Sequence, residues 1–398
     1  MKTLTSPAES DVDTGAAGGR RRRRAWLIWM IPLIVVALVL ALIWWRQTDS
    51  PEGAPPAAVA VDGRTQQAVE RFFDGYLQPD GRIARSDQGD DTVSEGQAYA
   101  MLMAAAVGDR ARFDLVWDWT RSNLQQPSGL LAWHWAGGEV ADTGSASDAD
   151  LFAAAALALA AERFGSEDLL TEARAMSDAI LTMETVAFGT DRVLAAGPWA
   201  TDKLLFNPSY WAVVPMAELS RALGDDRWDQ LAAVSRSMTN SLTSSWPNLP
   251  PDWAVGTSPG KMAPRHSPDG QTARYGADAV RIPIQFAVDC DPGGQELAAR
   301  SWTFLASRVG PTGSPTLPWV YSLDGQPMTD TTSAPSLVAA AAAAGAAGDR
   351  EAATGLLDAA SEHDRSYPTY YGAAWVALGR LWMQTNLAGG CRPGSPVH

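Results

Sequence analysis

Apolar residues recur at steps of three and four positions from Arg64 onward, and glycine, proline and aspartate separate the segments. This spacing is typical of all-α domains, whereas the alternation of a half-buried strand is scarce. Alanine-rich runs at 151–161 and 337–348 suit closely packed helices. Helices joined by alternating short and long loops are consistent with helical hairpins arranged in a ring. Periodicity alone does not show that such a ring closes. The pattern predicts twelve helices, which begin near Thr65, Ser94, Ala111, Ser147, Glu167, Pro208, Arg227, Ala277, Gln295, Pro335, Arg350 and Tyr367.

The pattern differs at residues 25–45, which are apolar or nearly so without interruption. About 20 such residues are enough to cross a bilayer as a helix, and the five arginines at 20–24 favour a cytoplasmic N-terminus. We therefore expect a single-pass membrane anchor with everything after Arg46 outside the cytoplasm. The alternative is a secreted protein whose signal peptide is cleaved after the small residues at 58–60, although the apolar run exceeds the roughly 7–15 residues usual for such signals.

Composition and periodicity divide the chain into five parts: a basic cytoplasmic tail at 1–24, the anchor at 25–45, a linker rich in proline and alanine at 46–63, a helical domain at 64–390 and a C-terminal tail at 391–398. The formal net charge is −14, and the part after the anchor is more acidic still because the basic tail is excluded from it. Such a domain repels nucleic acid and anionic lipid, so a neutral or cationic ligand is expected and a nucleic-acid partner is not.

Cys290 and Cys391 are the only cysteines. Outside the cytoplasm they can be oxidised to a disulfide if their Cα atoms lie within about 7 Å, and two unpaired buried thiols are an equally good interpretation. No CxxC spacing or histidine-rich segment accompanies them. A structural metal site is therefore not expected.

Several tryptophans of the helical domain fall outside the helical pattern. Each of them can pack beneath a long loop as part of the core. Each can also offer a flat apolar surface at small entropic cost, which is what the face of a sugar ring needs. These tryptophans are Trp133, Trp135, Trp199, Trp246, Trp253 and Trp319.

Glu95 lies in the stretch SEGQ, where a helix is expected to begin. Ser94 and Gln97 have the spacing of a capping box, which would place Glu95 in the first turn and favour its charged form. A general acid at this position needs burial or a second carboxylate to raise its pKa. Glu95 is therefore either a part of the helix start or an acid with unusual surroundings.

The stretch DTGSASDAD at 142–150 holds three aspartates and no basic residue. Ser147 and Asp150 have the spacing of a second capping box. Crowded carboxylates in a cleft also raise one another's pKa, which is how a site obtains a protonated acid beside an ionised one.

Two more motifs carry candidate chemistry. In GADAVRIP, Asp278 precedes Arg281 by three residues, and this local ion pair would keep Asp278 ionised, as a water-activating base requires. In NPSYW, Pro208 suits a first helical position and places Tyr210 near the beginning of a helix.

Taken in order, SEGQAYAMLMAAA, WTRSNL, LAWHW, SASDADLFAAAAL, NPSYW and GADAVRIP resemble the bacterial cellulase family 8 of glycoside hydrolases, and within it endoglucanases encoded with bacterial cellulose synthases. The resemblance covers about Arg64 to Trp382. It implies an (α/α)6 barrel of six helical hairpins, here preceded by the membrane helix, and inverting endo-hydrolysis of β-1,4-linked glucan. The expected substrate is a β-linked polysaccharide, and no metal ion or organic cofactor is implied. A tether to the outer face of the membrane suits a polysaccharide synthase complex as a partner.

The resemblance also assigns roles to single residues. It implies that Glu95 is the proton donor, that Asp278 is the catalytic base, and that Asp150 contacts and helps to distort the sugar at the cleavage point. The expected substrate-binding residues are Tyr210, Trp133, Trp135, Asp148 and Arg281.

Ala277 departs from the family, which commonly has tyrosine directly before the base. The departure leaves two alternatives open. One is a membrane-tethered glycan-binding or scaffold protein with reduced turnover. The other is a hydrolase of another β-1,4-linked polymer, such as chitosan or xylan.

Overall fold

The computed structural model describes residues 61–310 and 315–393. The expected anchor at 25–45 and almost all of the expected linker lie outside the described residues. Within them, no helix combines the length and the hydropathy that crossing a membrane demands. The first helix of the described residues begins at Gly63, close to the predicted start of the helical domain.

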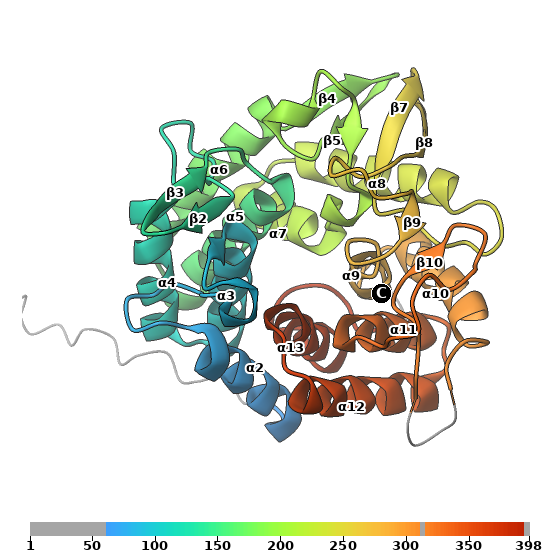
Figure 1. Cartoon of the computed structure of the whole chain (residues 1–398). Helices are drawn as coiled ribbons and strands as arrows, with labels where there is room; N and C mark the ends of the chain where they lie inside the picture. The colour runs from blue at the N-terminus through green and yellow to red at the C-terminus, as the bar shows by residue number, and fades with distance from the viewer. Residues whose placement is uncertain (1–60, 311–314, 394–398) are drawn as a thin grey trace, which may run out of the picture. The chain divides into compact units, whose positions relative to one another are not determined.

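Twelve long or medium helices of the described chain alternate between an outer and an inner ring, as predicted (Figure 1). Each inner helix contacts the next along the chain, and the last contacts the first, which closes the ring. The outer helices are α2 (Gly63–Tyr76), α4 (Arg110–Asn123), α6 (Glu167–Met183), α8 (Arg227–Leu242), α10 (Pro292–Leu305) and α12 (Arg350–Ser366). The inner helices are α3 (Ser94–Val107), α5 (Ser147–Phe164), α7 (Val213–Leu223), α9 (Arg281–Ala287), α11 (Ala334–Ala346) and α13 (Tyr370–Gln384).

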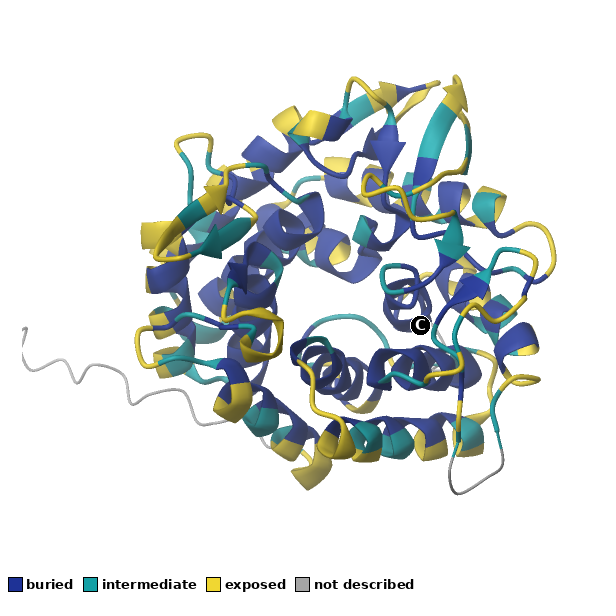
Figure 2. Ribbon diagram, viewed as in Figure 1, coloured by how far each residue is buried: buried dark blue, intermediate teal, exposed yellow. Residues whose placement is uncertain are grey.

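Side-chain size and polarity explain which helices lie inside. The alanine-rich helices α3, α5 and α11 are buried on nearly all sides, because small side chains allow neighbouring backbones to approach closely. The outer helices α2 and α12 instead have one buried and one exposed face, as Figure 2 shows by colour.

Short strands, which the periodicity did not predict, occupy the loops that lead from outer to inner helices. They form small antiparallel sheets of two or three strands. Their bounds are β1 (Thr92–Val93), β2 (His134–Ala136), β3 (Glu139–Asp142), β4 (Thr185–Phe188), β5 (Asp191–Leu194), β6 (Leu205–Phe206), β7 (Ala254–Ser258), β8 (Lys261–Pro264), β9 (Arg274–Tyr275) and β10 (Tyr321–Ser322). These loops therefore build a wall beside the N-terminal ends of the inner helices.

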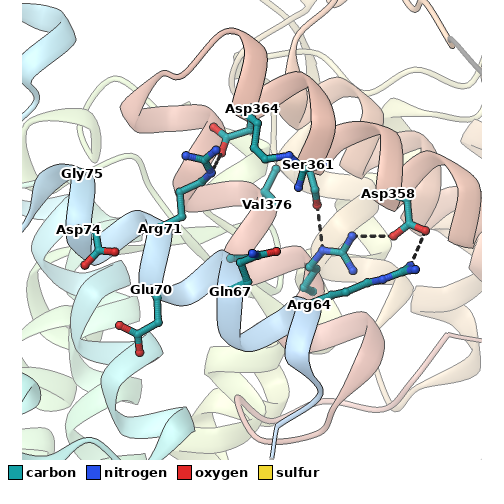
Figure 3. A pocket seen from close by; sticks show the side chains of 13 residues that line it. Arg64, Gln67, Glu70, Arg71, Asp74, Gly75, Asp358, Ser361, Asp364 and Val376 are labelled. Atoms are coloured by element: carbon teal, nitrogen blue, oxygen red, sulfur yellow. Dashed lines mark hydrogen bonds and ion pairs between the residues drawn. The ribbon is translucent and has the colours of Figure 1, made fainter.

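The first helix is joined to the last hairpin by ion pairs that line a pocket of about 800 Å³ (Figure 3). Asp358 of α12 accepts hydrogen bonds from Arg64 of α2 at 2.6 Å and from Arg380 of α13 at 2.8 Å. Arg71 of α2 lies 3.4 Å from the buried Asp364. These contacts span the two ends of the ring.

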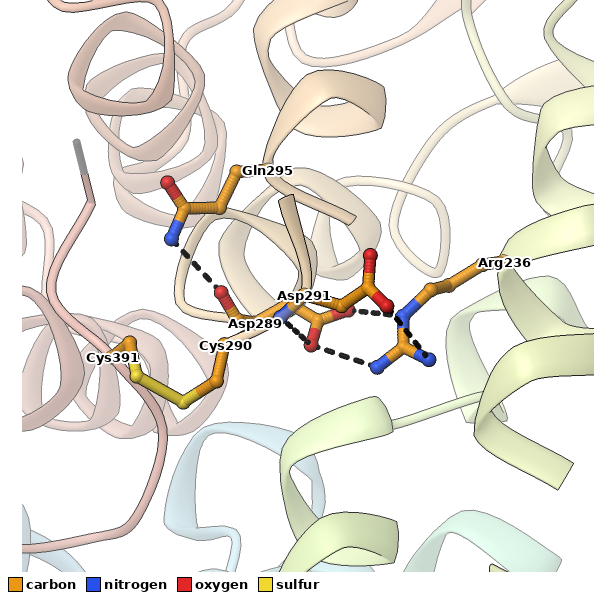
Figure 4. The surroundings of a disulfide bond; sticks show 6 residues. All are labelled: Arg236, Asp289, Cys290, Asp291, Gln295 and Cys391. Atoms are coloured by element: carbon orange, nitrogen blue, oxygen red, sulfur yellow. Dashed lines mark hydrogen bonds and ion pairs between the residues drawn. A yellow bond between two sulfur atoms is a disulfide. The ribbon is translucent and has the colours of Figure 1, made fainter. Parts of the chain in front are cut away.

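A disulfide joins Cys290, in the turn between α9 and α10, to Cys391, after α13 (Figure 4). Their Cα atoms are 5.0 Å apart, and the Cys391 N–H donates to the Val288 carbonyl at 2.7 Å. The disulfide alternative is thereby confirmed, and the first residue of the predicted C-terminal tail is fixed to the barrel.

Candidate active site

The N-terminal turns of α3, α5 and α9 meet around one buried cation, Arg281. Its Nη1 lies 2.8 Å from Asp148 Oδ2 and 3.5 Å from Glu95 Oε2, and its Nη2 lies 2.9 Å from Asp278 Oδ1. Three motifs that are far apart in the sequence therefore share a single guanidinium group. We call these four residues the Arg281 cluster.

The loop NPSYW contacts the guanidinium group of the Arg281 cluster. It forms a short 3₁₀ helix (Pro208–Tyr210) capped by Asn207, whose side chain accepts from the Ser209 N–H. Arg281 Nη2 donates to Ser209 Oγ at 2.6 Å, and the guanidinium carbon lies 5.2 Å from the centre of the Tyr210 ring. Arg281 is thus held by hydrogen bonds and by an aromatic face.

Neither predicted capping box forms. Helix α3 begins at Ser94 without a side-chain cap, and Gln97 instead accepts from the Ile83 N–H at 2.5 Å and donates to Thr120 Oγ1 at 2.8 Å. Likewise, α5 begins at Ser147, whose hydroxyl donates to the Ala195 carbonyl at 2.6 Å. Both motifs instead fix long loops to helices, a role that sequence spacing does not reveal.

Two members of the Arg281 cluster reach solvent and two do not. The side chains of Glu95 and Asp278 are 24% and 32% exposed, whereas those of Asp148 and Arg281 are each 2% exposed. Glu95 and Asp278 line a pocket of about 420 Å³ together with Trp319. These two carboxylates are therefore the ones that can touch a ligand.

Burial controls the protonation of the hidden members. Burial raises the pKa of Asp148 to about 7, although Arg281 opposes the shift and Glu95 adds to it. Burial alone would lower the pKa of Arg281, but the surrounding phenols and carboxylates hold it well above its usual range. The cluster therefore combines a permanent positive charge with a carboxyl group that can hold a proton near neutral pH.

Tyr370 and Tyr371 at the start of α13 line the same pocket and were not found by sequence reasoning. The Tyr371 hydroxyl donates to the carbonyl of Ala277, next to Asp278, at 2.7 Å. A Cβ atom at Gly96 would lie 2.6 Å from the Tyr370 hydroxyl, so only glycine fits there. The aromatic pair directly after Thr369, which caps α13, was the available signal.

Asp150 does not join the Arg281 cluster. It is fully buried, and its Oδ1 accepts from the Leu131 N–H at 2.7 Å. Its carboxyl group interacts with that of Glu184, which is also fully buried. Asp148, two residues earlier, instead contacts Arg281 together with Glu95.

The two predicted tryptophans of the LAWHW segment lie in different surroundings. Trp135 packs edge-on against Trp119 of α4, with ring centres 5.5 Å apart, and Arg82 lies over its face. Trp133 is 36% exposed and stacks on His134. Trp133 therefore keeps a free surface, whereas Trp135 is part of the packing.

Aromatic rings extend from the Arg281 cluster along the loops. The Tyr210 and Trp253 rings are 6.3 Å apart, and those of Trp253 and Trp199 are 6.4 Å apart. Trp199 is 40% exposed. The arrangement offers a row of apolar faces that begins at the acidic site.

An all-α ring with two solvent-accessible carboxylates beside an aromatic row defines a hydrolase of sugar polymers. Residues 56–385 match the family described as Glycosyl hydrolases family 8, and the chain belongs to that family. It is a glycoside hydrolase with the family's (α/α)6 barrel.

Individual relatives agree with this assignment. A probable endoglucanase of Novacetimonas hansenii is 34% identical over 62% of this chain and 73% of its own length. An endoglucanase of Cellulomonas uda is 30% identical over 55% of this chain and 62% of its own length. The solved endo-β-1,4-glucanase CMCax of Acetobacter xylinum superposes with a TM-score of 0.67 at 28% identity, covering 82% of this chain and 98% of the other.

Proposed function

We propose that the protein is an inverting, endo-acting hydrolase of β-1,4-linked glucan, with Glu95 as general acid and Asp278 as general base. The observation that carries the proposal is the pair of accessible carboxylates on the two sides of Arg281. The endoglucanases to which the chain is similar support glucan as the substrate.

The separation of the two carboxylates permits inversion, and the anomer of the first product decides between inversion and retention. Each contacts one terminal nitrogen of the same planar guanidinium, at 3.5 Å and 2.9 Å, so their nearest oxygens are at most roughly 9 Å apart. Inverting glycosidases place the two carboxyl groups about 6.5–9.5 Å apart to admit a water molecule, and retaining enzymes about 5–5.5 Å apart.

In the proposed reaction, Glu95 protonates the glycosidic oxygen while Asp278 takes a proton from the water that attacks the anomeric carbon from the opposite face. Arg281 Nη2 lies 2.9 Å from Asp278 Oδ1 and so fixes the position of the proposed base. We assign to Asp148, rather than Asp150, the supporting role beside the acid, because Asp148 shares Arg281 with Glu95 and can hold a proton near neutral pH.

The aromatic row supports an extended polymer as the substrate. Sugar rings stack on exposed tryptophan faces, and Trp133 and Trp199, which are 36% and 40% exposed, supply such faces. A groove that binds several rings suits cleavage within a chain, whereas a closed pocket suits removal of an end.

Glu95→Gln and Asp278→Asn are each expected to lower the release of reducing ends from carboxymethylcellulose about 1,000-fold or more, because each removes one proton-transfer group. The matched control is Glu167→Gln, since Glu167 occupies the first turn of the outer helix α6 and is exposed. It should retain wild-type activity, and all three variants should keep the wild-type melting temperature within a few degrees.

Proton NMR of the first product gives the stereochemistry, and inversion requires the α-anomer to appear first. An initial β-anomer, or an active Glu95→Gln variant, contradicts the proposed mechanism. Parallel assays on xylan and chitosan identify the polymer. The absence of turnover on every glycan, with binding retained, would instead establish a glycan-binding protein.

We further propose that residues 25–45 anchor the protein, with the barrel outside the cytoplasm, where a synthase complex exporting a polysaccharide would present its substrate. The disulfide supports this location because such bonds persist in oxidising compartments. Membrane fractionation and protease treatment of whole cells test it. The barrel should stay in the membrane fraction and be cleaved from outside, and release into the medium would favour the cleaved signal peptide.

A further inference from the structure

Asp252, in the loop between α8 and β7, contacts the segment that carries Asp278. It is 6% exposed, and its Oδ1 accepts two backbone hydrogen bonds, from Gly276 N–H at 2.9 Å and from Ala279 N–H at 2.8 Å. Its own N–H donates to the Arg274 carbonyl at 2.7 Å. One buried carboxylate oxygen thus binds the backbone on both sides of Asp278.

The bound segment is the turn that leads into α9. Within it, the Val280 N–H donates to the Gly276 carbonyl at 3.1 Å, and the Arg281 N–H donates to the Asp278 carbonyl at 3.1 Å. A Cβ atom at Gly276 would lie 2.6 Å from Asp252 Oδ2, so glycine is required for the carboxylate to approach this closely. The close approach of the Asp252 carboxylate therefore depends on both the shape of this turn and the absence of a side chain at Gly276.

Three groups that carry or can acquire charge face Asp252: Arg274, whose Nε lies 3.2 Å from Oδ2, the carboxylate of Asp278 and the phenol of Tyr275. Burial first and Asp278 second raise the pKa of Asp252 to about 6, although the Ala279 N–H and Arg274 oppose the shift. At neutral pH the group is therefore an ionised carboxylate.

The raised pKa of Asp252 makes the stability of the fold depend on pH. A carboxyl whose folded-state pKa lies above its unfolded value of 3.8 contributes stability below that value, and the contribution is lost as pH rises through about 6. The two backbone hydrogen bonds to Oδ1 need an acceptor oxygen at this position, whether or not that oxygen carries a charge. The role of Asp252 is therefore argued from its contacts with the Asp278 turn.

We infer that Asp252 is a positioning residue for the reaction: it fixes the backbone turn that holds Asp278 and so sets the position of the base opposite Glu95. The inference rests on the proposed role of Asp278 as base. It adds a residue that does not touch the substrate and that no motif of the sequence marks.

Asp252→Ala is expected to lower kcat about 10–100-fold, because a displacement of the base by about 1 Å costs that much, while KM stays within about twofold since the sugar contacts remain. Asp252→Asn keeps an oxygen that accepts from both N–H groups, and it should retain kcat within about threefold of wild type. Gly276→Ala should reproduce the effect of Asp252→Ala, because the added methyl group displaces the carboxylate.

Asp289→Ala is the matched control. Asp289 is also buried, and it accepts a bidentate pair of bonds from Arg236, at 2.6 Å and 2.8 Å, beside the disulfide. Its loss should lower the melting temperature without changing kcat. If Asp252→Ala behaves in the same way, with kcat unchanged, the inference is overturned.

A double-mutant comparison separates positioning from general destabilisation. In the Asp278→Asn background, Asp252→Ala should lower the residual kcat by less than about twofold, because the group that it positions is already gone. If Asp252→Ala lowers kcat in the Asp278→Asn background by the same factor as in the wild type, the inference is contradicted. An Asp278→Asn variant with full activity refutes the proposed base itself, whereas an inactive Asp278→Asn beside a fully active Asp252→Ala refutes the positioning role alone.

Discussion

At the scale of single residues, Arg281 is the group on which the site depends. It contacts carboxylates from three separate motifs, and it is itself buried. Its planar guanidinium donates along fixed directions, so it sets the relative positions of those carboxylates as well as neutralising them. A positive charge without fixed donor directions would neutralise the carboxylates but would not position them.

Arg281→Lys tests that distinction. The lysine keeps the positive charge but cannot reach Asp148, Asp278 and Glu95 together, so kcat/KM should fall about 100-fold or more. Arg236→Lys is the control, because Arg236 forms a similar bidentate pair with Asp289 away from the pocket. Steady-state kinetics and thermal unfolding of both variants are the measurements. If Arg281→Lys is as active as the wild type, Arg281 acts only by neutralising the carboxylates and not by positioning them.

The sequence predicted most of the residues of this site, but it did not predict which aspartate of α5 faces Glu95. Glu95, Asp278 and Arg281 were predicted and do lie together. Asp148 and Asp150 differ by two residues, which is about 200° around a helix, and α5 is buried on nearly all sides. Periodicity therefore could not tell which aspartate faces Glu95.

At the scale of elements, a pair of acids joins α5 to the end of α6. Asp150 lies in the first turn of α5, and Glu184 directly follows α6. Both are fully buried and within hydrogen-bonding reach of each other, and among the described residues neither forms an ion pair with a basic side chain. Burial first, and their mutual repulsion, raise the pKa of Glu184 well above its usual range. The pair therefore favours a shared proton over two negative charges.

Glu184→Gln is expected to make the protein more stable at alkaline pH. In the unfolded chain both acids lose their protons above about pH 4, whereas the folded pair keeps one, so stability falls as pH rises towards the folded pKa, by about 1.4 kcal/mol per pH unit for each retained proton. Glutamine keeps a donor to Asp150 without that proton.

Thermal unfolding between pH 5 and pH 9 measures the effect. The melting temperature of Glu184→Gln should rise relative to wild type as pH increases, and Glu167→Gln, at the exposed start of α6, should follow the wild-type curve throughout. Parallel curves for Glu184→Gln and wild type would show that the pair carries no extra proton.

The elements themselves were predictable to different degrees. Helices with long apolar stripes were found close to their true starts, as α6 and α8 show. Helix α9 was placed at Ala277 and begins at Arg281, because the preceding turn is held by Asp252 rather than by helical hydrogen bonds. The strands of two to five residues are too short to give a period.

At the scale of the whole described barrel, closure depends on contacts between the ends of the chain. The inner ring closes where α13 meets α3, and α2 is tied to the last hairpin through Asp358. The number of helices followed from periodicity, but which ends meet did not, since local spacing contains no information about contacts some 300 residues apart. The disulfide adds a covalent tie between α9 and the chain after α13.

Removing that tie with Cys290→Ala and Cys391→Ala together should lower the free energy of unfolding by about 2–4 kcal/mol, because the bond closes a loop with a sequence separation of 101 residues. Cellulase activity at 25 °C should be unchanged, since Arg281 and its carboxylates lie at the opposite end of α9 from Cys290. Unfolding by guanidinium chloride and initial rates on carboxymethylcellulose measure the two effects. A loss of activity with unchanged stability would mean that the bond acts on the pocket and not on the unfolded chain. The expected result instead separates the two ends of the barrel, one specialised for chemistry and the other for holding the ring closed.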